Sequence, residues 1–120
     1  MKKIIYSPGE PAGIGPDLII QLATSKAWEN FKIPIISVGD PNLFIERAKK
    51  LKKRLKVLEL DSVELVKKNK QSLIQVLKVS KCINTSPRNL SKINAQYVLD
   101  VLDYSIKQTI NNKKTALVTG

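Results

Sequence analysis

The stretch SPGEPAGIGPD, from Ser7 to Asp17, decides how the rest of the chain is interpreted. The apolar run at 3–6 before it predicts a strand, and the run at 18–23 after it has the spacing of a helix. Glycines let a backbone approach a ligand closely, and the first turn of a helix offers N–H groups and a partial positive charge. This order predicts either an anion-binding loop or a tight turn that holds no ligand.

The start of the helix can be placed from the same stretch. We expect Gly15 near the N-cap, Pro16 at the first helical position and Asp17 in the first turn. A carboxylate there suits the helix dipole but would compete with an anionic ligand. The expected buried face consists of Leu18, Ile19, Leu22 and Ala23. The glycine spacing matches neither the dinucleotide fingerprint nor the P-loop.

The length and composition indicate one soluble α/β domain covering residues 1–120. Hydrophobic residues make up 42% of the chain and charged residues 26%, as is typical of a globular protein. No apolar run has the length of a membrane span, and the single Cys82 has no partner for an internal disulfide. We therefore expect a cytoplasmic protein in which Cys82 is structural.

The net charge of +11 comes largely from a basic window between Arg47 and Lys70. Such a window could bind nucleic acid. However, no aromatic residue interleaves with the lysines as a platform for base stacking, so a solvated surface is the favoured interpretation. The same charge would attract a phosphorylated substrate or a dinucleotide without specificity.

The remaining elements predict a three-layer α/β/α fold with a mostly parallel sheet. Strands are expected at 33–38, 54–60, 73–79 (at a sheet edge) and 115–118 (buried), helices at 41–51 and from Ser91 to about 110, and a loop at 84–89. The first of these helices should bury Leu43, Phe44, Ala48 and Leu51. The second should bury Ile93, Tyr97, Val98, Val101, Leu102, Ile106 and Ile110.

Ligands of such sheets bind beyond the carboxyl ends of the strands. Three segments fall there: the loop 7–15, the corner Gly39–Asp40 and the terminal Thr119–Gly120. Asp40 is either a ribose ligand or, as we favour, an N-cap. Glu10 is either a base or hydroxyl ligand or, as we favour, a cap for loop N–H groups. The chain has no histidine, so no imidazole is available for a metal or a proton.

The string GEPAGIGPD at 9–17 resembles the N-terminal signature of the 4-hydroxythreonine-4-phosphate dehydrogenase family of pyridoxine biosynthesis, and the likeness continues to ALVTG at 116–120. The resemblance implies a fold similar to part of the isocitrate and isopropylmalate dehydrogenases. Members are longer, two-domain homodimers. They oxidise 4-hydroxythreonine 4-phosphate with NAD or NADP, and the product then loses carbon dioxide. A divalent metal assists as a Lewis acid.

The resemblance also implies which residues take part. The expected cofactor-binding residues are Gly9, Glu10, Gly13, Ile14 and Gly15, together with Thr119 and Gly120. Catalytic residues and metal ligands of the family lie beyond the matched segment, so none is expected in this chain. We therefore expect a truncated, inactive part of the dehydrogenase. The alternatives are a small phosphate- or nucleotide-binding module and a basic nucleic-acid-binding protein.

Overall fold

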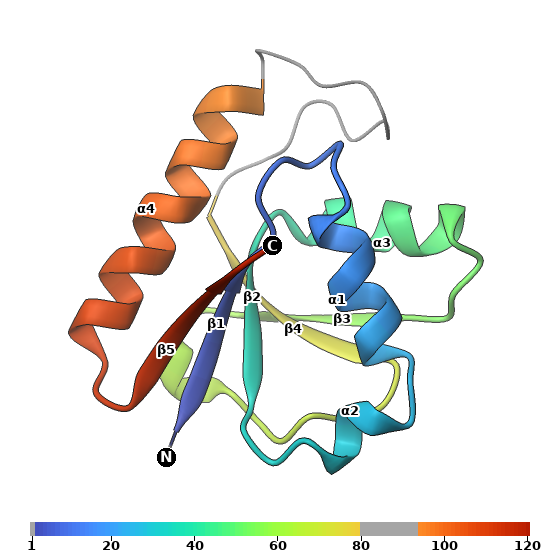
Figure 1. Cartoon of the computed structure of the whole chain (residues 1–120), viewed down its shortest axis with the longest axis horizontal. Coiled ribbons are helices and arrows are strands. Elements are labelled where there is room, and N and C mark those ends of the chain that lie inside the picture. The colour runs from blue at the N-terminus through green and yellow to red at the C-terminus, as the bar shows by residue number, and fades with distance from the viewer. Residues whose placement is uncertain (1, 80–93) are drawn as a thin grey trace.

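The computed structural model describes residues 2–79 and 94–120 (Figure 1). The predicted loop at 84–89, Cys82, the Ser91 cap and Ile93 lie outside these described residues. The predicted order of strands and helices is confirmed within the described ranges, with two short helical segments added. The elements are β1 (Lys3–Ser7), α1 (Gly15–Ala23), α2 (Ala27–Asn30), β2 (Ile35–Gly39), α3 (Pro41–Lys50), β3 (Lys56–Leu60), η1 (Val63–Leu65), β4 (Leu73–Lys78), α4 (Ala95–Asn111) and β5 (Thr115–Thr119).

One sheet forms the centre of the described part of the chain. Its strand order is β3-β4-β2-β1-β5, and all four neighbouring pairs are parallel. Figure 1 shows α1 and α3 on one side of the sheet and α4 on the other, which confirms the three-layer α/β class. Because parallel strands with covered faces are buried on both sides, β2 is apolar along almost its whole length.

Each face of the sheet has its own hydrophobic core. The core beneath α1, α2 and α3 is built around Ile20, Trp28 and Phe44. The core beneath α4 is built around Ile36, Val38 and Val101. The predicted buried face of α3 is confirmed for Leu43, Phe44 and Ala48, and Leu51 packs at the margin of the first core.

The buried face of α1 differs from the prediction. Pro16, Ile19, Ile20 and Ala23 face the core, whereas Leu18 and Leu22 are 52% and 44% exposed. Both faces are apolar, so periodicity alone cannot choose between them. In the orientation that the helix adopts, the Asp17 carboxylate contacts Arg47 of α3. The helix also begins one residue earlier than predicted, with Ile14 as N-cap.

The edges of the sheet were also predicted incorrectly. The strand at 73–79 was expected at an edge, but β4 lies between β3 and β2. The last strand was expected to be buried, but β5 is an edge strand whose Val118 is 45% exposed. In the predicted stripe on α4, Tyr97 and Val101 are buried and Val98 packs half-buried against the same core. Ile106 and Ile110 are exposed, because no element of the described chain covers them.

Candidate functional site

The sheet brings the carboxyl ends of β1 and β5 side by side, because these two strands are parallel neighbours. In open α/β sheets, ligands bind outside the carboxyl ends of the strands. We call the place beyond the carboxyl ends of these two strands the β1/β5 crevice.

The two predicted loop segments meet at the β1/β5 crevice. The Gly120 N–H donates to the Ser7 carbonyl at 2.8 Å, directly beyond the last pair of the ladder. Gly9 has φ of +81°, and a Cβ there would lie 2.8 Å from the Gly120 carbonyl oxygen. Glycine at position 9 is therefore needed for both its conformation and its close approach to the end of β5.

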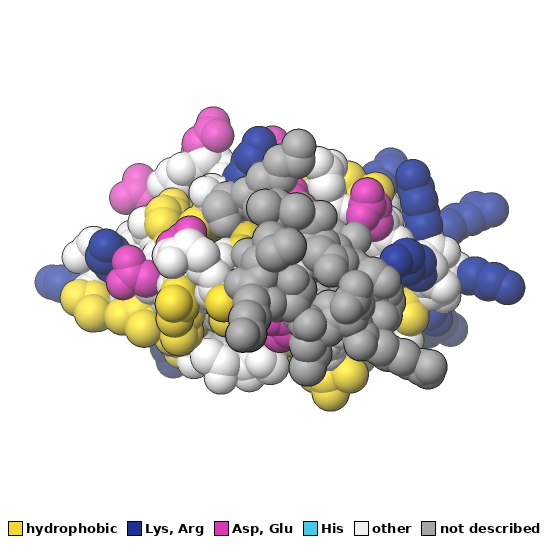
Figure 2. Space-filling view, turned by 90° about the horizontal axis from the view of Figure 1, so that it is seen from above, with side chains coloured by type: hydrophobic (Ala, Val, Ile, Leu, Met, Phe, Trp, Pro, Cys, Tyr) yellow, Lys and Arg dark blue, Asp and Glu magenta, His cyan; other side chains and the backbone are white. Residues whose placement is uncertain are grey.

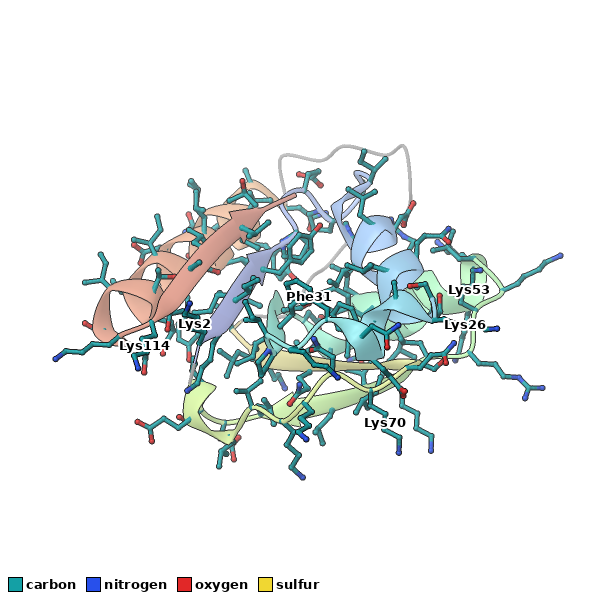
Figure 3. All side chains as sticks on the ribbon, turned by 60° about the horizontal axis from the view of Figure 1, so that its bottom comes forward. Lys2, Lys26, Phe31, Lys53, Lys70 and Lys114 are labelled. Carbon is teal, nitrogen blue, oxygen red and sulfur yellow. The ribbon has the colours of Figure 1, made fainter. Side chains whose placement is uncertain are left out.

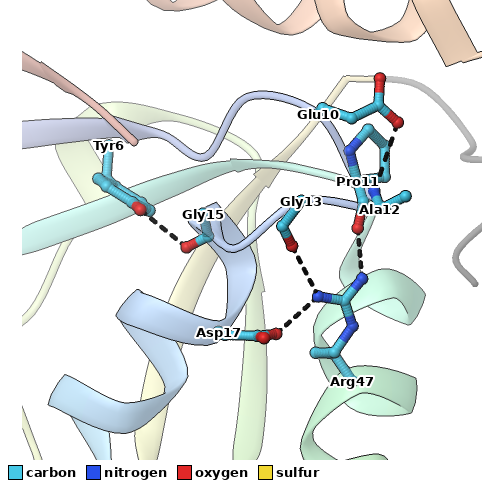
Figure 4. A network of polar contacts seen from close by, with 8 residues as sticks. All are labelled: Tyr6, Glu10, Pro11, Ala12, Gly13, Gly15, Asp17 and Arg47. Atoms are coloured by element: carbon cyan, nitrogen blue, oxygen red, sulfur yellow. Dashed lines mark hydrogen bonds and ion pairs between the residues drawn. The ribbon is translucent and has the colours of Figure 1, made fainter. Parts of the chain in front are cut away.

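The loop is held from the opposite side by Arg47 of α3 (Figure 4). Its Nη1 donates to the Gly13 carbonyl at 3.0 Å and to Asp17 Oδ1 at 2.6 Å, and its Nη2 donates to the Pro11 carbonyl. Only 2% of the Arg47 side chain is exposed. A guanidinium has several donors in a rigid plane, so one side chain can join two carbonyls and a carboxylate.

Arg47 was expected to belong to the basic surface window, and this prediction was wrong because the side chain is buried. Arg47 lies on the same helical face as Leu43, Phe44, Ala48 and Leu51, which are spaced for burial. An arginine within such a face needs an acceptor set that is also buried. The place of Arg47 on this buried helical face was therefore the sequence signal that could have shown its role in holding the loop.

Asp17 lies in the first turn of α1, as predicted, and its carboxylate is paired with Arg47. Its ion pair with Arg47 balances its charge, and its side chain remains 31% exposed. The expected competition between Asp17 and an anionic ligand is therefore reduced by the neighbouring guanidinium.

Glu10 adopts the loop-capping role that we favoured. Its Oε1 accepts from the Ala12 N–H at 3.3 Å, and its carbonyl accepts from the Gly13 N–H at 2.9 Å. These two bonds close the turn between Pro11 and Gly13. The following residue, Ile14, is 70% exposed at the start of α1.

The corner Gly39–Asp40 is a structural cap, as we favoured. Asp40 Oδ1 accepts from the Asn42 N–H at 3.0 Å, and Asp40 is only 3% exposed. The Asp40 N–H donates to the Tyr97 hydroxyl at 2.9 Å. A Cβ at Gly39 would lie 2.6 Å from that hydroxyl oxygen, so glycine allows α4 to pack against this corner.

Tyr6 joins the first strand to the start of α1. Its hydroxyl donates to the Gly15 carbonyl at 2.8 Å (Figure 4). Burial raises the pKa of the Tyr6 phenol above 10.0, since desolvation disfavours the phenolate. The neutral phenol is therefore the form that supports the loop.

The lysines of the basic window lie away from the crevice. Figure 2, which looks down on the molecule of Figure 1, shows Lys and Arg side chains gathered at one end of it. A hollow of about 470 Å³ there is lined by Lys53, Arg54, Lys56 and Lys70, at the amino ends of β3 and β4. Figure 3 shows Lys53 and Lys70 projecting outward. These basic side chains form a solvated surface at the opposite end of the sheet from the β1/β5 crevice.

An apolar groove of about 420 Å³ lies between α1, α2 and the strands β1 and β5. Its rim includes the exposed side chains of Leu18, Leu22, Phe31 and Val118. It ends at Thr119 and Gly120, so it adjoins the β1/β5 crevice.

Within residues 2–79 and 94–120, no three His, Cys, Asp or Glu side chains are grouped so as to hold a metal ion. None of the helices in these ranges is long and apolar enough to cross a membrane.

The fold and the crevice define an α/β protein whose parallel sheet carries its candidate ligand site beyond the carboxyl ends of its strands. No family model matches the chain. Curated relatives named 4-hydroxythreonine-4-phosphate dehydrogenase do match: that of Vibrio parahaemolyticus is 34% identical over 120 residues, covering 100% of this chain and 35% of the relative. That of Colwellia psychrerythraea is 31% identical over 119 residues, covering 99% and 35%.

Solved structures support the same fold. The 4-hydroxythreonine-4-phosphate dehydrogenase of Klebsiella pneumoniae has a TM-score of 0.85 at 19% identity, covering 100% of this chain and 37% of that one. The enzyme of Burkholderia phymatum has a TM-score of 0.85 at 13% identity, covering 99% and 36%. The resemblance to this dehydrogenase family is confirmed over the whole chain, which spans about a third of the length of these proteins.

The close contact at Gly15 can be tested with a matched pair of alanine variants. In Gly15→Ala the new Cβ would lie 1.7 Å from the Pro8 carbonyl oxygen, so the loop backbone must move. We expect the free energy of unfolding to fall by about 3 kcal/mol or more. In Gly13→Ala the nearest atom is the Glu10 carbonyl oxygen at 3.2 Å, and we expect a loss below about 1 kcal/mol. Urea unfolding of both variants measures the difference, and equal losses would contradict this packing.

The raised pKa of Tyr6 predicts a specific alkaline loss of stability. Above pH 10.0 the unfolded chain releases this phenol proton while the folded chain retains it, so stability falls as the pH rises toward the folded pKa. Below that range the Tyr6→Phe variant should lose only one hydrogen bond, about 0.5–1.5 kcal/mol. Urea unfolding of both proteins between pH 8 and about 11 should show their stabilities converging. Parallel curves would mean that the Tyr6 phenol is not protected by burial.

Proposed function

We propose that this chain is the N-terminal, loop-bearing part of an NAD(P)-dependent 4-hydroxythreonine-4-phosphate dehydrogenase. Residues 1–120 form one α/β domain portion within a longer, two-domain enzyme. The observation that carries the proposal is similarity over 98–100% of this chain to about a third of proteins with that name. The signature GEPAGIGPD lies beyond the carboxyl end of β1, where a ligand of an open α/β sheet is expected on physical grounds.

The nicotinamide cofactor would be held at the β1/β5 crevice. The contributing residues are Gly9, Glu10, Gly13, Ile14 and Gly15 from the loop, with Thr119 and Gly120 from the end of β5. The contact between Gly9 and Gly120 supports this grouping because it brings both segments to one place. When bound, NAD or NADP accepts a hydride from the alcohol carbon of 4-hydroxythreonine 4-phosphate, and the resulting oxo acid loses carbon dioxide. The chain's own part is to fix the loop backbone against which the cofactor rests.

The divalent metal implied for this chemistry does not fit the residues present. The chain has no histidine, and no three acidic or cysteine side chains are grouped for a metal in the described ranges. Its ligands would therefore come from polypeptide outside this sequence. We accordingly propose that the 120-residue chain alone is inactive.

The surface of the chain supports a larger assembly. The β3 edge carries Lys56 and Glu59, whereas β5, TALVT, carries no charge or proline along its open edge. Natural proteins protect exposed edges with charged residues, so an edge without them is usually covered. An apolar groove lies beside β5, and Leu99, Ile106 and Ile110 of α4 are exposed on the other side of the sheet. We propose that the rest of the dehydrogenase covers these surfaces, in a cytoplasmic homodimer.

A chimera tests this function directly. Residues 1–120 would replace the matching third of the Vibrio parahaemolyticus relative, to which they are 34% identical. We expect the chimera to form reduced nicotinamide from 4-hydroxythreonine 4-phosphate, because the missing groups are supplied by the relative. The isolated chain under the same conditions should form none.

The chimera needs a control that separates the loop from the rest of the fold. A second chimera with Gly15→Ala should lose activity, since its Cβ displaces the loop at Pro8. Turnover by the isolated chain would contradict the proposal. So would a chimera that folds like the relative but has no activity.

A further inference from the structure

Arg47 is a buried cation that contacts the loop at 9–17. It does not belong to that loop. It projects from α3, and its partners at Pro11, Gly13 and Asp17 lie 30 to 36 residues earlier in the sequence. Figure 4 shows the carbonyls of Pro11 and Gly13 both directed at its guanidinium. The loop backbone is therefore oriented by a side chain that does not belong to it.

The chemistry of the acceptors selects arginine at this place. Two carbonyl oxygens and one carboxylate need a donor set that is planar, multiple and permanently charged, which a guanidinium provides. A lysine ammonium is a single point charge on a flexible stem, so it could hold the carboxylate or one carbonyl but not the full set. With 2% of the side chain exposed, water does not readily replace the missing donors.

The ion pair also adjusts the charge at the start of α1. Asp17 alone would place a negative charge in the first turn, where the phosphate of a nucleotide is stabilised by the helix dipole. Arg47 lies 2.6 Å from that carboxylate and balances it. One side chain thus fixes the shape of the loop and removes the charge that would oppose an anionic ligand.

We propose that Arg47 is a positioning residue, which sets the GEPAGIGPD loop in its ligand-accepting shape and neutralises Asp17 so that the cofactor phosphates can approach. The identity of the ligand rests on the proposed function. The ordering of the loop does not, because it follows from the contacts within this chain.

The first arm of the test measures loop order without any ligand. In Arg47→Met, amide hydrogen exchange at Ala12 and Gly13, which donate to Glu10, should become about tenfold faster or more. Exchange at the central strand residue Ile36 should stay within about twofold. Arg54→Met is the matched control, since it removes the same charge from an exposed residue and should change neither value.

Two further variants keep this arm decisive if Arg47→Met folds poorly. Arg47→Lys retains the charge but not the planar donor set, and it should loosen the loop while Ile36 stays protected. In Arg47→Met with Asp17→Asn, the unpaired carboxylate is removed, so the fold should recover while the loop stays loose. Uniform acceleration in all three variants would overturn the proposal by showing a general structural role. Unchanged loop exchange would overturn it as well.

The second arm measures the cofactor in the chimera described above. Arg47→Lys should raise the KM for NAD by about tenfold or more while kcat changes less, because the loop binds the cofactor and does not perform the chemistry. Arg54→Met should leave both constants unchanged. An Arg47→Lys chimera that retains the parent KM despite a loosened loop would overturn the link to the ligand. If the parent chimera has no activity but loop exchange responds as expected, the proposed function fails and the positioning of the loop by Arg47 stands.

Discussion

The contact between the Arg47 guanidinium and the loop at 9–17 is the interaction on which the rest of the structure depends. It joins α3 to the turn after β1 through two carbonyls and a carboxylate, all within a nearly buried site. It also holds Asp17 of α1 against α3. In the same orientation of the helix Ile19, Ile20 and Ala23 are buried, and Leu18 and Leu22 lie on the apolar groove. The polar contact and the apolar packing of α1 therefore agree on one rotation of the helix.

The topology then gives the loop its place. Because β1 and β5 are parallel neighbours, their carboxyl ends lie side by side at one end of the sheet. The bond from Gly120 to Ser7 joins them there, and Gly9 lies against the same carbonyl end. The basic surface lies at the opposite ends of β3 and β4. The candidate site is therefore indicated by its place at the carboxyl ends of the strands, and not by the basic charge of the chain.

The sequence predicted the features that depend on local pattern. The strands, the main helices, the parallel α/β class and the Asp40 cap follow from periodicity and turn chemistry over short distances. It could not predict the features that depend on distant partners. Arg47 was assigned to a surface window because its acceptors at Pro11 and Gly13 are far away in the chain. The edge position of β5 and the exposure of Ile106 and Ile110 depend on what covers them, which no local pattern records.

The most direct measurement is to map NAD on the 120-residue chain by titration with NMR chemical shifts. We expect the largest shifts at Gly9, Ile14, Gly15 and Gly120, which meet at the β1/β5 crevice. We expect little change at Lys53, Arg54 and Lys70, at the other end of the sheet. Shifts concentrated at those basic residues, or no response at saturating cofactor, would contradict the claim that the crevice is a nucleotide site.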